Sequence, residues 1–316
     1  MRRALIVGVD DYPGAPLRGC VNDATSLTEV LKRNEDGSPN FDCKLITSPP
    51  FAVTRASLKE NVTRLFEHEA DVALFYFSGH GTANNLGGYL VTPDAQQYDE
   101  GVPMQDVLAM ANSAGKIREV VILLDCCHSG ALGQVPVIAN EAAILREGVS
   151  VLTASRAGQV SIEIRGGGLF TGLVKGALNG GASDVLGKVT IASLYAYVDQ
   201  ALGSWEQRPL FKAHVSKLIS LRNCRPGVLP EILRLLPKYF PLPDGEFKLD
   251  PSYEPDAAPP HPEHEETFGH LQKFRAARLL APVGEEHMYF AAMHSRSCRL
   301  TPLGQFYWQL ANDGKL

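Results

Sequence analysis

The chain has 316 residues, of which 45% are hydrophobic and 21% are charged, a composition typical of a soluble globular protein. A formal net charge of −5 gives no electrostatic case for binding nucleic acid or an anionic membrane. No apolar run reaches the roughly 18 residues of a membrane span, and Arg2-Arg3 leads into a strand pattern instead of a signal peptide. Six cysteines, two of them adjacent, do not suggest a disulfide framework, so we expect a cytoplasmic protein.

The first part of the chain alternates strand and helix patterns. Runs of apolar and β-branched residues predict strands at 4–9, 41–46, 71–77 and 120–124 and a short strand or hairpin at 89–92. Apolar residues at helical spacing predict helices at 24–33, 54–70 and 104–113, the first of them capped by Asn22 or Asp23. This order predicts an α/β fold with a mainly parallel sheet and helices on both faces.

The pattern continues more irregularly up to residue 223. We expect strands at 149–153 and 215–220 and helices at 169–178 and 190–202. Glycines at 166–168 indicate a turn before the first of these helices. We therefore predict one domain over residues 1–223.

The remainder of the chain is rich in proline at first and then regular. Residues 224–262 hold ten of the 21 prolines, which predicts a linker with a short helix at 230–239. Residues 263–316 are expected to form a small α+β module similar to a winged helix, with helices at 263–280 and from Thr301 and a strand at 288–292. The module has mixed charges without a basic stripe, so we do not expect it to bind DNA.

Two of the predicted strands end in residues that can carry chemistry. Ser78-Gly79-His80-Gly81 follows the strand at 71–77, and Asp125-Cys126-Cys127-His128 follows the strand at 120–124. His80 precedes Cys127 by 47 residues, which is enough for one crossover connection with its helix. If the two strands are neighbours in a parallel sheet, both motifs reach the same edge. A cysteine and a histidine there are suited to nucleophilic catalysis on a carbonyl group.

These residues allow three other interpretations. His128 is a rival base, but it lies too close in sequence to reach the sulfur of its neighbour. Cys126 points to the opposite side of the strand from Cys127, so we expect it to pack in the core. A zinc site is not expected, because adjacent residues on an extended chain point in opposite directions and the chain has no Cys-x-x-Cys pair.

The motifs resemble those of the caspase-like cysteine peptidases, specifically metacaspases and their prokaryotic relatives. The similarity rests on YFSGHG at 76–81, DCCHSG at 125–130, ALIVGVDDY at 4–12 and LRGCVNDA at 17–24, and it extends over residues 3 to 222. It implies a caspase-like fold and a cysteine endopeptidase (a hydrolase) that works with a dyad of His80 and Cys127. It also implies an oxyanion hole made of the backbone N–H groups of Gly81 and Cys127.

The resemblance also implies a substrate preference. The positions that form an acidic pocket for Arg or Lys in metacaspases match Cys20, Asp23, Ser78 and Asp125 here. Asp125 lies two residues before Cys127 and therefore on the same side of the strand. The alternative for Asp23 is that it only caps a helix.

Calcium binding and proteolytic processing are further features of the family. Many metacaspases bind Ca²⁺ through acidic loop residues, for which Asp94, Asp99, Glu100 and Asp106 are the candidates, although no cofactor need be required. Only Gln134 stands where an acidic partner would be expected after the cysteine motif. Cleavage is expected after Arg146, with Arg165 as the second choice; the alternative is an uncut surface loop.

The combined prediction is a regulated zymogen in a bacterial antiviral defence or cell-death pathway. Its partners would be protein substrates cut after Arg or Lys and an upstream protease or regulatory protein, with the C-terminal module recruiting or restraining the peptidase. Two alternatives remain: a catalytically silent scaffold with the caspase fold, and a peptidase of different specificity.

Overall fold

A computed structural model describes residues 1–126, 144–154, 163–164, 167–202 and 209–316. The chain divides into two compact units. The first comprises Met1–Ser183 and Lys188–Cys224, and the second comprises Asp184–Gly187 and Arg225–Leu316. The division after Cys224 lies within one residue of the domain end predicted from the sequence.

The first unit is built on a six-stranded sheet with the order β12-β8-β7-β3-β1-β2. Five strands run parallel: β1 (Arg2–Val9), β2 (Asp42–Ser48), β3 (Ala70–Gly79), β7 (Ile117–Cys126) and β8 (Val149–Thr153). The edge strand β12 (Leu210–His214) is antiparallel to β8. The predicted α/β class with a mainly parallel sheet is confirmed.

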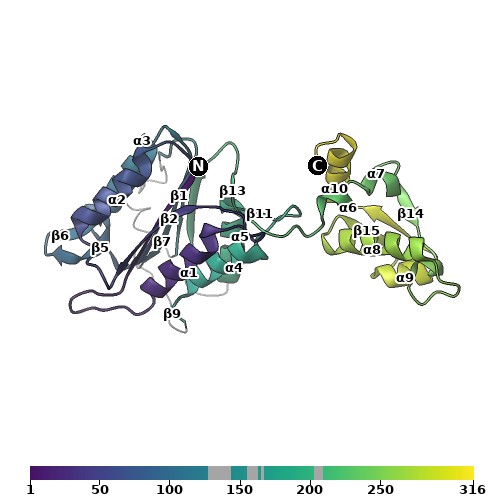
Figure 1. Ribbon diagram of the computed structural model, residues 1–316, viewed down its shortest axis with the longest axis horizontal. Coiled ribbons are helices and arrows are strands. Elements are labelled where there is room, and N and C mark those ends of the chain that lie inside the picture. The colour runs from purple at the N-terminus through teal and green to yellow at the C-terminus, as the bar shows by residue number, and fades with distance from the viewer. Residues whose placement is uncertain (127–143, 155–162, 165–166, 203–208) are drawn as a thin grey trace. The chain divides into compact units, whose positions relative to one another are not determined.

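Helices cover both faces of this sheet (Figure 1). One face packs against α2 (Arg55–Glu67) and α3 (Met104–Ser113), and the other against α1 (Cys20–Lys32), α4 (Leu169–Gly176) and α5 (Ile191–Leu202). Side chains of a strand alternate between faces, so Phe75 and Phe77 enter the first core and Tyr76 the second. Because of this alternation, only polar residues on the same face of the sheet can contact one another.

Helices α1 and α2 begin for different local reasons. Thr54 and Ser57 form a reciprocal capping box at the start of α2. The start of α1 is held from outside, because the carboxylate of Asp10 accepts the backbone N–H groups of Cys20 (2.8 Å) and Val21 (3.4 Å). We expected Asn22 or Asp23 to cap this helix. The helix starts earlier, so Asp23 lies inside its first turn and is not the cap.

Smaller elements complete the first unit. Directly after β3, the strands β4 (Gly81–Asn84), β5 (Gly87–Gln96) and β6 (Asp99–Pro103) form an antiparallel sheet. Two short ribbons pair β9 (Glu163–Ile164) with β10 (Gly167–Gly168) and β11 (Lys188–Thr190) with β13 (Ser220–Asn223). The chain leaves α4 through the π-turn η2 (Ala177–Gly181).

The second unit has its own core and a three-stranded antiparallel sheet with the order β14-β16-β15. Its elements are α6 (Pro230–Leu233), α7 (Leu236–Tyr239), β14 (Glu246–Lys248), η3 (Pro251–Tyr253), α8 (Pro262–Ala276), β15 (Leu280–Val283), α9 (Met288–Met293), β16 (Ser297–Leu300) and α10 (Pro302–Asn312).

Two features of this unit differ from the sequence-based expectation. Residues 225–262, expected to be a linker, contribute Leu233, Leu236 and Phe240 to the core, and the indole of Trp308 donates to the Phe240 carbonyl at 2.6 Å. The prolines there separate short elements instead of keeping the segment open. The strand expected at 288–292 is helix α9, as its methionines and alanines favour. Across the described residues, no helix combines the length and apolar character needed to cross a membrane.

Candidate active site

The parallel pairing of β3 and β7 brings the two motifs to one edge of the sheet. In the register of the two strands, Ser78 lies opposite Asp125 and Gly79 opposite Cys126. In the sequence, His80 follows Gly79 and Cys127 follows Cys126. Cys127, the nucleophile candidate, and His128, its rival base, lie outside the described residues.

The imidazole of His80 is held by backbone and aromatic neighbours from the loop after β1. Its Nε2 lies 2.8 Å from the carbonyl oxygen of Ala15. A carbonyl can only accept a hydrogen bond, so Nε2 carries the hydrogen and Nδ1 is the nitrogen able to accept a proton. Fixing the tautomer in this way leaves His80 ready to act as a base.

Tyr12 supports the same histidine from a second direction. Its ring packs on the imidazole with centroids 4.6 Å apart, and its hydroxyl accepts the backbone N–H of His80 at 3.0 Å and donates to the Val91 carbonyl at 3.2 Å. Burial raises the pKa of Tyr12, which keeps the hydroxyl protonated as a donor. A side chain on Gly79 would collide with this hydroxyl, which explains the glycine before His80.

An open hollow of about 430 Å³ lies beside His80. Among the described residues that line it, only His80 and Tyr12 have ionisable side chains, and most of the others are small or apolar. Gly81, the oxyanion-hole candidate, borders it as the first residue of β4. The described lining comprises Tyr12, Pro13, Ala15, His80, Gly81, Thr82, Val91, Thr92, Pro93 and Ala95.

The four predicted pocket residues are all buried and lie together on the α1 side of the sheet. Asp23 and Asp125 are only 4% and 5% exposed. Both carboxylates approach β10: Asp23 Oδ2 accepts the backbone N–H of Gly168 at 2.7 Å, and a side chain on Gly168 would collide with Asp125 Oδ2. Asp125 Oδ2 also accepts a hydrogen bond from the Thr171 hydroxyl at 2.6 Å. The structure therefore brings the two acids together under one glycine.

Cys20 and Ser78 lie beside the two acids, and we refer to these four buried residues as the acidic pocket, after the role predicted for them. The pKa of the Cys20 thiol is raised, first by burial and then by the negative charges of Asp10, Asp125 and Asp23, and a hydrogen bond with Ser78 only partly offsets this. The thiol is therefore neutral and unsuited to be a nucleophile. Cys126 is 1% exposed within the α2 and α3 core, which confirms that it is a packing residue.

The calcium candidates lie elsewhere and have basic or amide neighbours. Asp94 accepts the backbone N–H of Arg55 at 3.0 Å, and Asp99 pairs with the guanidinium of the same arginine. Asp106 pairs with Lys59 at 2.8 Å, and Glu100 accepts a hydrogen bond from the side chain of Asn84 at 3.2 Å. Within the described part of the chain, no three His, Cys, Asp or Glu side chains gather to hold a metal ion. Gln134 lies outside it.

Of the two predicted processing sites, only Arg146 lies in the described part of the chain. Arg146 is anchored: its guanidinium donates to the carbonyls of Ala111 (3.2 Å), Ala114 (2.9 Å), Ile117 (2.9 Å) and Glu147 (2.7 Å). It thereby binds the carbonyl end of α3. Arg165 lies outside the described residues.

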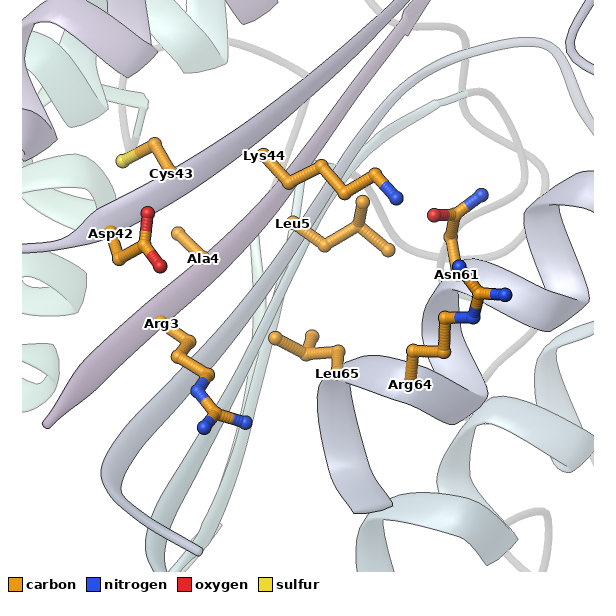
Figure 2. Close-up of a pocket in the computed structure, with 9 residues that line it drawn as sticks. All are labelled: Arg3, Ala4, Leu5, Asp42, Cys43, Lys44, Asn61, Arg64 and Leu65. Carbon is orange, nitrogen blue, oxygen red and sulfur yellow. The ribbon is translucent and has the colours of Figure 1, made fainter. Parts of the chain in front are cut away.

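A second hollow, of about 340 Å³, lies at the opposite edge of the sheet, where β1 and β2 begin. Figure 2 shows Arg3, Lys44, Asn61 and Arg64 around it, with Leu5 and Leu65 on its floor. The described residues that line it include none of the predicted catalytic or substrate-binding residues.

Sequence reasoning did not identify Ala15, Tyr12, Gly168 or Thr171 as parts of the site. Ala15 and Gly168 act through backbone atoms, which leave no side-chain signature. Thr171 stands 46 residues after Asp125, and only the packing of α4 on the sheet makes them neighbours. The one signal for Thr171 was a hydroxyl residue in the first turn of a mostly apolar helix.

Comparison with known proteins agrees with this geometry. The family model of the caspase domain matches residues 1–220. Metacaspase-1 of Scheffersomyces stipitis is 29% identical over 163 residues (46% of this chain and 40% of that protein). Metacaspase III c of Phaeodactylum tricornutum is 30% identical over 162 residues (43% and 45%). The chain thus spans less than half the length of these two relatives.

Solved structures show the same fold at low sequence identity. Caspase-1 of Spodoptera frugiperda superposes with a TM-score of 0.52 at 14% identity, covering 71% of this chain and 90% of the caspase. A protein of Geobacter sulfurreducens superposes with a TM-score of 0.50 at 15% identity, covering 72% and 98%. With the caspase-domain match over most of its length, the chain belongs to the caspase family and is similar to its metacaspase branch.

Proposed function

We propose that the protein is a cysteine endopeptidase that cuts after Arg or Lys with a dyad of His80 and Cys127. The observation that carries this proposal is the buried pair Asp23 and Asp125, which lies at the sheet edge where β3 and β7 lead into His80 and Cys127. Two carboxylates at such a place favour a cationic partner. A substrate guanidinium or ammonium group provides that charge.

The contact between His80 Nε2 and the Ala15 carbonyl supports a role for Nδ1 as the base in acyl transfer. Nδ1 takes the proton of the Cys127 thiol, and the thiolate attacks the substrate carbonyl carbon. The backbone N–H groups of Gly81 and Cys127 stabilise the oxyanion that forms. The imidazolium returns the proton to the leaving amine, after which water hydrolyses the thioester with His80 as base. The Ala15 carbonyl holds Nε2–H throughout, so the ring does not change tautomer.

The hollow beside His80 suits the leaving half of the substrate. His80 must protonate the leaving amine, so the residue that follows the cut has to pass this ring. Apart from Tyr12 and His80 itself, the residues lining this hollow in the described part of the chain are uncharged. We therefore place the charged side chain in the acidic pocket and an uncharged side chain on the leaving side.

Regulation is the second part of the proposal. Caspase-family peptidases need no cofactor in general, and we treat Ca²⁺ as an activator to be tested. Cleavage after Arg146 would first have to release its guanidinium from the end of α3, so this site is protected until that contact opens. Arg165 is the other processing site, and the second unit would recruit or restrain the peptidase within a cytoplasmic defence or cell-death pathway.

The test is hydrolysis of fluorogenic peptides that end in Arg, Lys or Asp. Each peptide is tried with Ca²⁺, with chelator and after limited trypsin treatment, using the wild type, Cys127→Ala and the matched control Cys126→Ala. We expect turnover of the Arg and Lys peptides alone, lost by at least about 10³-fold in Cys127→Ala and kept in Cys126→Ala.

Each other result contradicts a separate part of the proposal. Turnover of the Asp peptide contradicts the acidic pocket. Turnover that survives Cys127→Ala contradicts the nucleophile. No turnover by the wild type under any condition favours a scaffold with the caspase fold.

A further inference from the structure

Two buried hydroxyl groups form consecutive hydrogen bonds that lead to one carboxylate of the acidic pocket. The Tyr76 hydroxyl lies 2.6 Å from Thr171 Oγ1, and Thr171 Oγ1 lies 2.6 Å from Asp125 Oδ2. Tyr76 and Thr171 are 0% exposed and Asp125 is 5% exposed. The three residues come from β3, α4 and β7, so these consecutive hydrogen bonds exist only in the folded unit.

The direction of these hydrogen bonds follows from the groups involved. An ionised carboxylate can only accept, so the Thr171 hydroxyl donates to Asp125. The Thr171 oxygen then accepts the hydrogen of Tyr76. Burial, with the charges of Asp125 and Asp23 adding to it, raises the pKa of Tyr76 well above its ordinary value, so this phenol keeps its proton. Two O–H dipoles therefore point in series at Asp125.

We infer that Thr171, backed by Tyr76, is a positioning residue that keeps the Asp125 carboxylate ionised and fixed in orientation, and so sets the preference for a cationic over a neutral substrate side chain. This inference rests on the proposed function of the acidic pocket. Burial favours the neutral form of a carboxyl group, whereas a donated hydrogen bond favours the charged form. Without that donor, Asp125 would lose charge and the pocket its preference.

The surroundings of Asp125 show what the Thr171 donor acts against. Among the described residues, those that face it include Asp23 and Cys20 from α1, Tyr76 and Ser78 from β3, Thr171 from α4 and the backbone of Gly168 from β10. Asp23 is a like charge and disfavours ionisation of Asp125. Phe170 and Val174 of α4 pack in the core and hold Thr171 in place.

The test compares Thr171→Val, which keeps the shape without the hydroxyl, with Thr171→Ser, which keeps the hydroxyl, and with Tyr76→Phe. Each variant is assayed between pH 5 and 8 with two peptides that differ only in arginine or citrulline, a neutral analogue of similar shape. Thermal unfolding checks that each variant folds. Separate values of kcat and KM show whether the change lies in binding.

We expect Thr171→Val to lower kcat/KM for the arginine peptide by about 10- to 100-fold, mainly through KM. The citrulline peptide should change by less than about threefold, because a neutral side chain does not depend on the charge of Asp125. The loss should deepen as pH falls, since Asp125 without its donor takes up a proton at a higher pH than in the wild type. Tyr76→Phe should give a smaller loss of the same kind, and Thr171→Ser should stay close to the wild type.

Three outcomes overturn the inference. An unchanged kcat/KM for the arginine peptide in Thr171→Val does so while leaving the proposed function intact, and so does an equal loss on both peptides, which indicates only a structural role. If the wild type does not cleave the arginine peptide, the proposed function fails and this inference fails with it. If Thr171→Val does not fold, the arginine-to-citrulline ratio of Tyr76→Phe decides by the same criteria.

Discussion

Two groups of carboxylates in the first unit differ sharply in their surroundings. Asp99 and Asp106 are 53% and 39% exposed and pair with the basic side chains Arg55 and Lys59. Asp23 and Asp125 are 4% and 5% exposed and accept hydrogen bonds from a backbone N–H and a buried hydroxyl. The sequence offered both groups as ligand sites, one for Ca²⁺ and one for a cationic side chain.

The difference indicates which group is better suited to hold a cation. An exposed ion pair contributes about 0–1 kcal/mol and exchanges readily with water and salt. A buried carboxylate held by oriented dipoles lies where electrostatic interactions are strong, so a cation that enters it gains much more. The predictions below test this contrast.

The largest effect is expected from removing charge in the buried group. Asp125→Asn and Asp23→Asn keep the size of the side chain and an oxygen that accepts the existing hydrogen bond. Each should lower kcat/KM for an arginine peptide by about 30- to 1,000-fold, equivalent to roughly 2–4 kcal/mol. Asp99→Asn, the matched control from the exposed group, should change it by less than about threefold. A comparable loss in the control would show that the exposed group takes part in the activity.

The second effect concerns the glycine that covers the buried pair. The methyl group of Gly168→Ala would collide with Asp125 Oδ2 and lie 3.1 Å from Asp23 Oδ2, so one carboxylate or β10 must shift. We expect kcat/KM for the arginine peptide to fall by about tenfold or more. Gly172→Ala in α4 has no neighbour within 4 Å and should leave activity unchanged. Equal rates in the two variants would refute the close approach of β10 to the acids.

Cysteine alkylation tests the electrostatic character of the same pocket. Burial and the neighbouring acids raise the pKa of Cys20, and burial raises the pKa of Cys43 from 9.0 to about 11. A pKa near 11 leaves about 100-fold less thiolate than a pKa of 9, so both thiols should react slowly at pH 8. Peptide mapping by mass spectrometry after brief iodoacetamide treatment should find Cys127 labelled well before Cys20 and Cys43. Early labelling of Cys20 would mean that the pocket is neither closed nor acidic.

The smallest effect is expected for Glu119, a buried carboxylate that belongs to neither group. Burial raises the pKa of Glu119, although its side chain accepts the backbone N–H of Ile219 at 2.8 Å. The folded chain therefore binds this proton more tightly than the unfolded chain, so stability falls as pH rises from the ordinary to the raised pKa of a glutamate. Glu119→Gln should flatten that dependence without changing activity. Urea midpoints at pH 4.5 and pH 7 measure it, and an unchanged difference between them would contradict the assignment.

Much of this protein could be predicted from its sequence alone. The apolar runs of β3 and β7 predict buried parallel strands, because only a sheet covered on both faces buries such segments. The polar residues at their ends, His80 and Cys127, follow from the same pattern, since parallel strands present their carboxyl ends at one edge. The motifs at 17–24, 76–81 and 125–130 also indicated the family. Residue types are enough to predict these features, because each feature is either local in sequence or follows from the direction of the strands.

Only the tertiary structure determines which groups orient His80 and which contact the two buried acids. The Ala15 carbonyl that fixes the tautomer of His80 is a backbone atom, and every residue except proline offers the same donor and acceptor. The approach of Gly168 and Thr171 to the buried acids depends on how α4 and β10 pack on the sheet, which no spacing along the chain specifies. The second unit shows the same limit: residues 225–262 contain enough proline to suggest an open linker, yet they pack because Leu233, Leu236 and Phe240 find a shared core with α8 and α10.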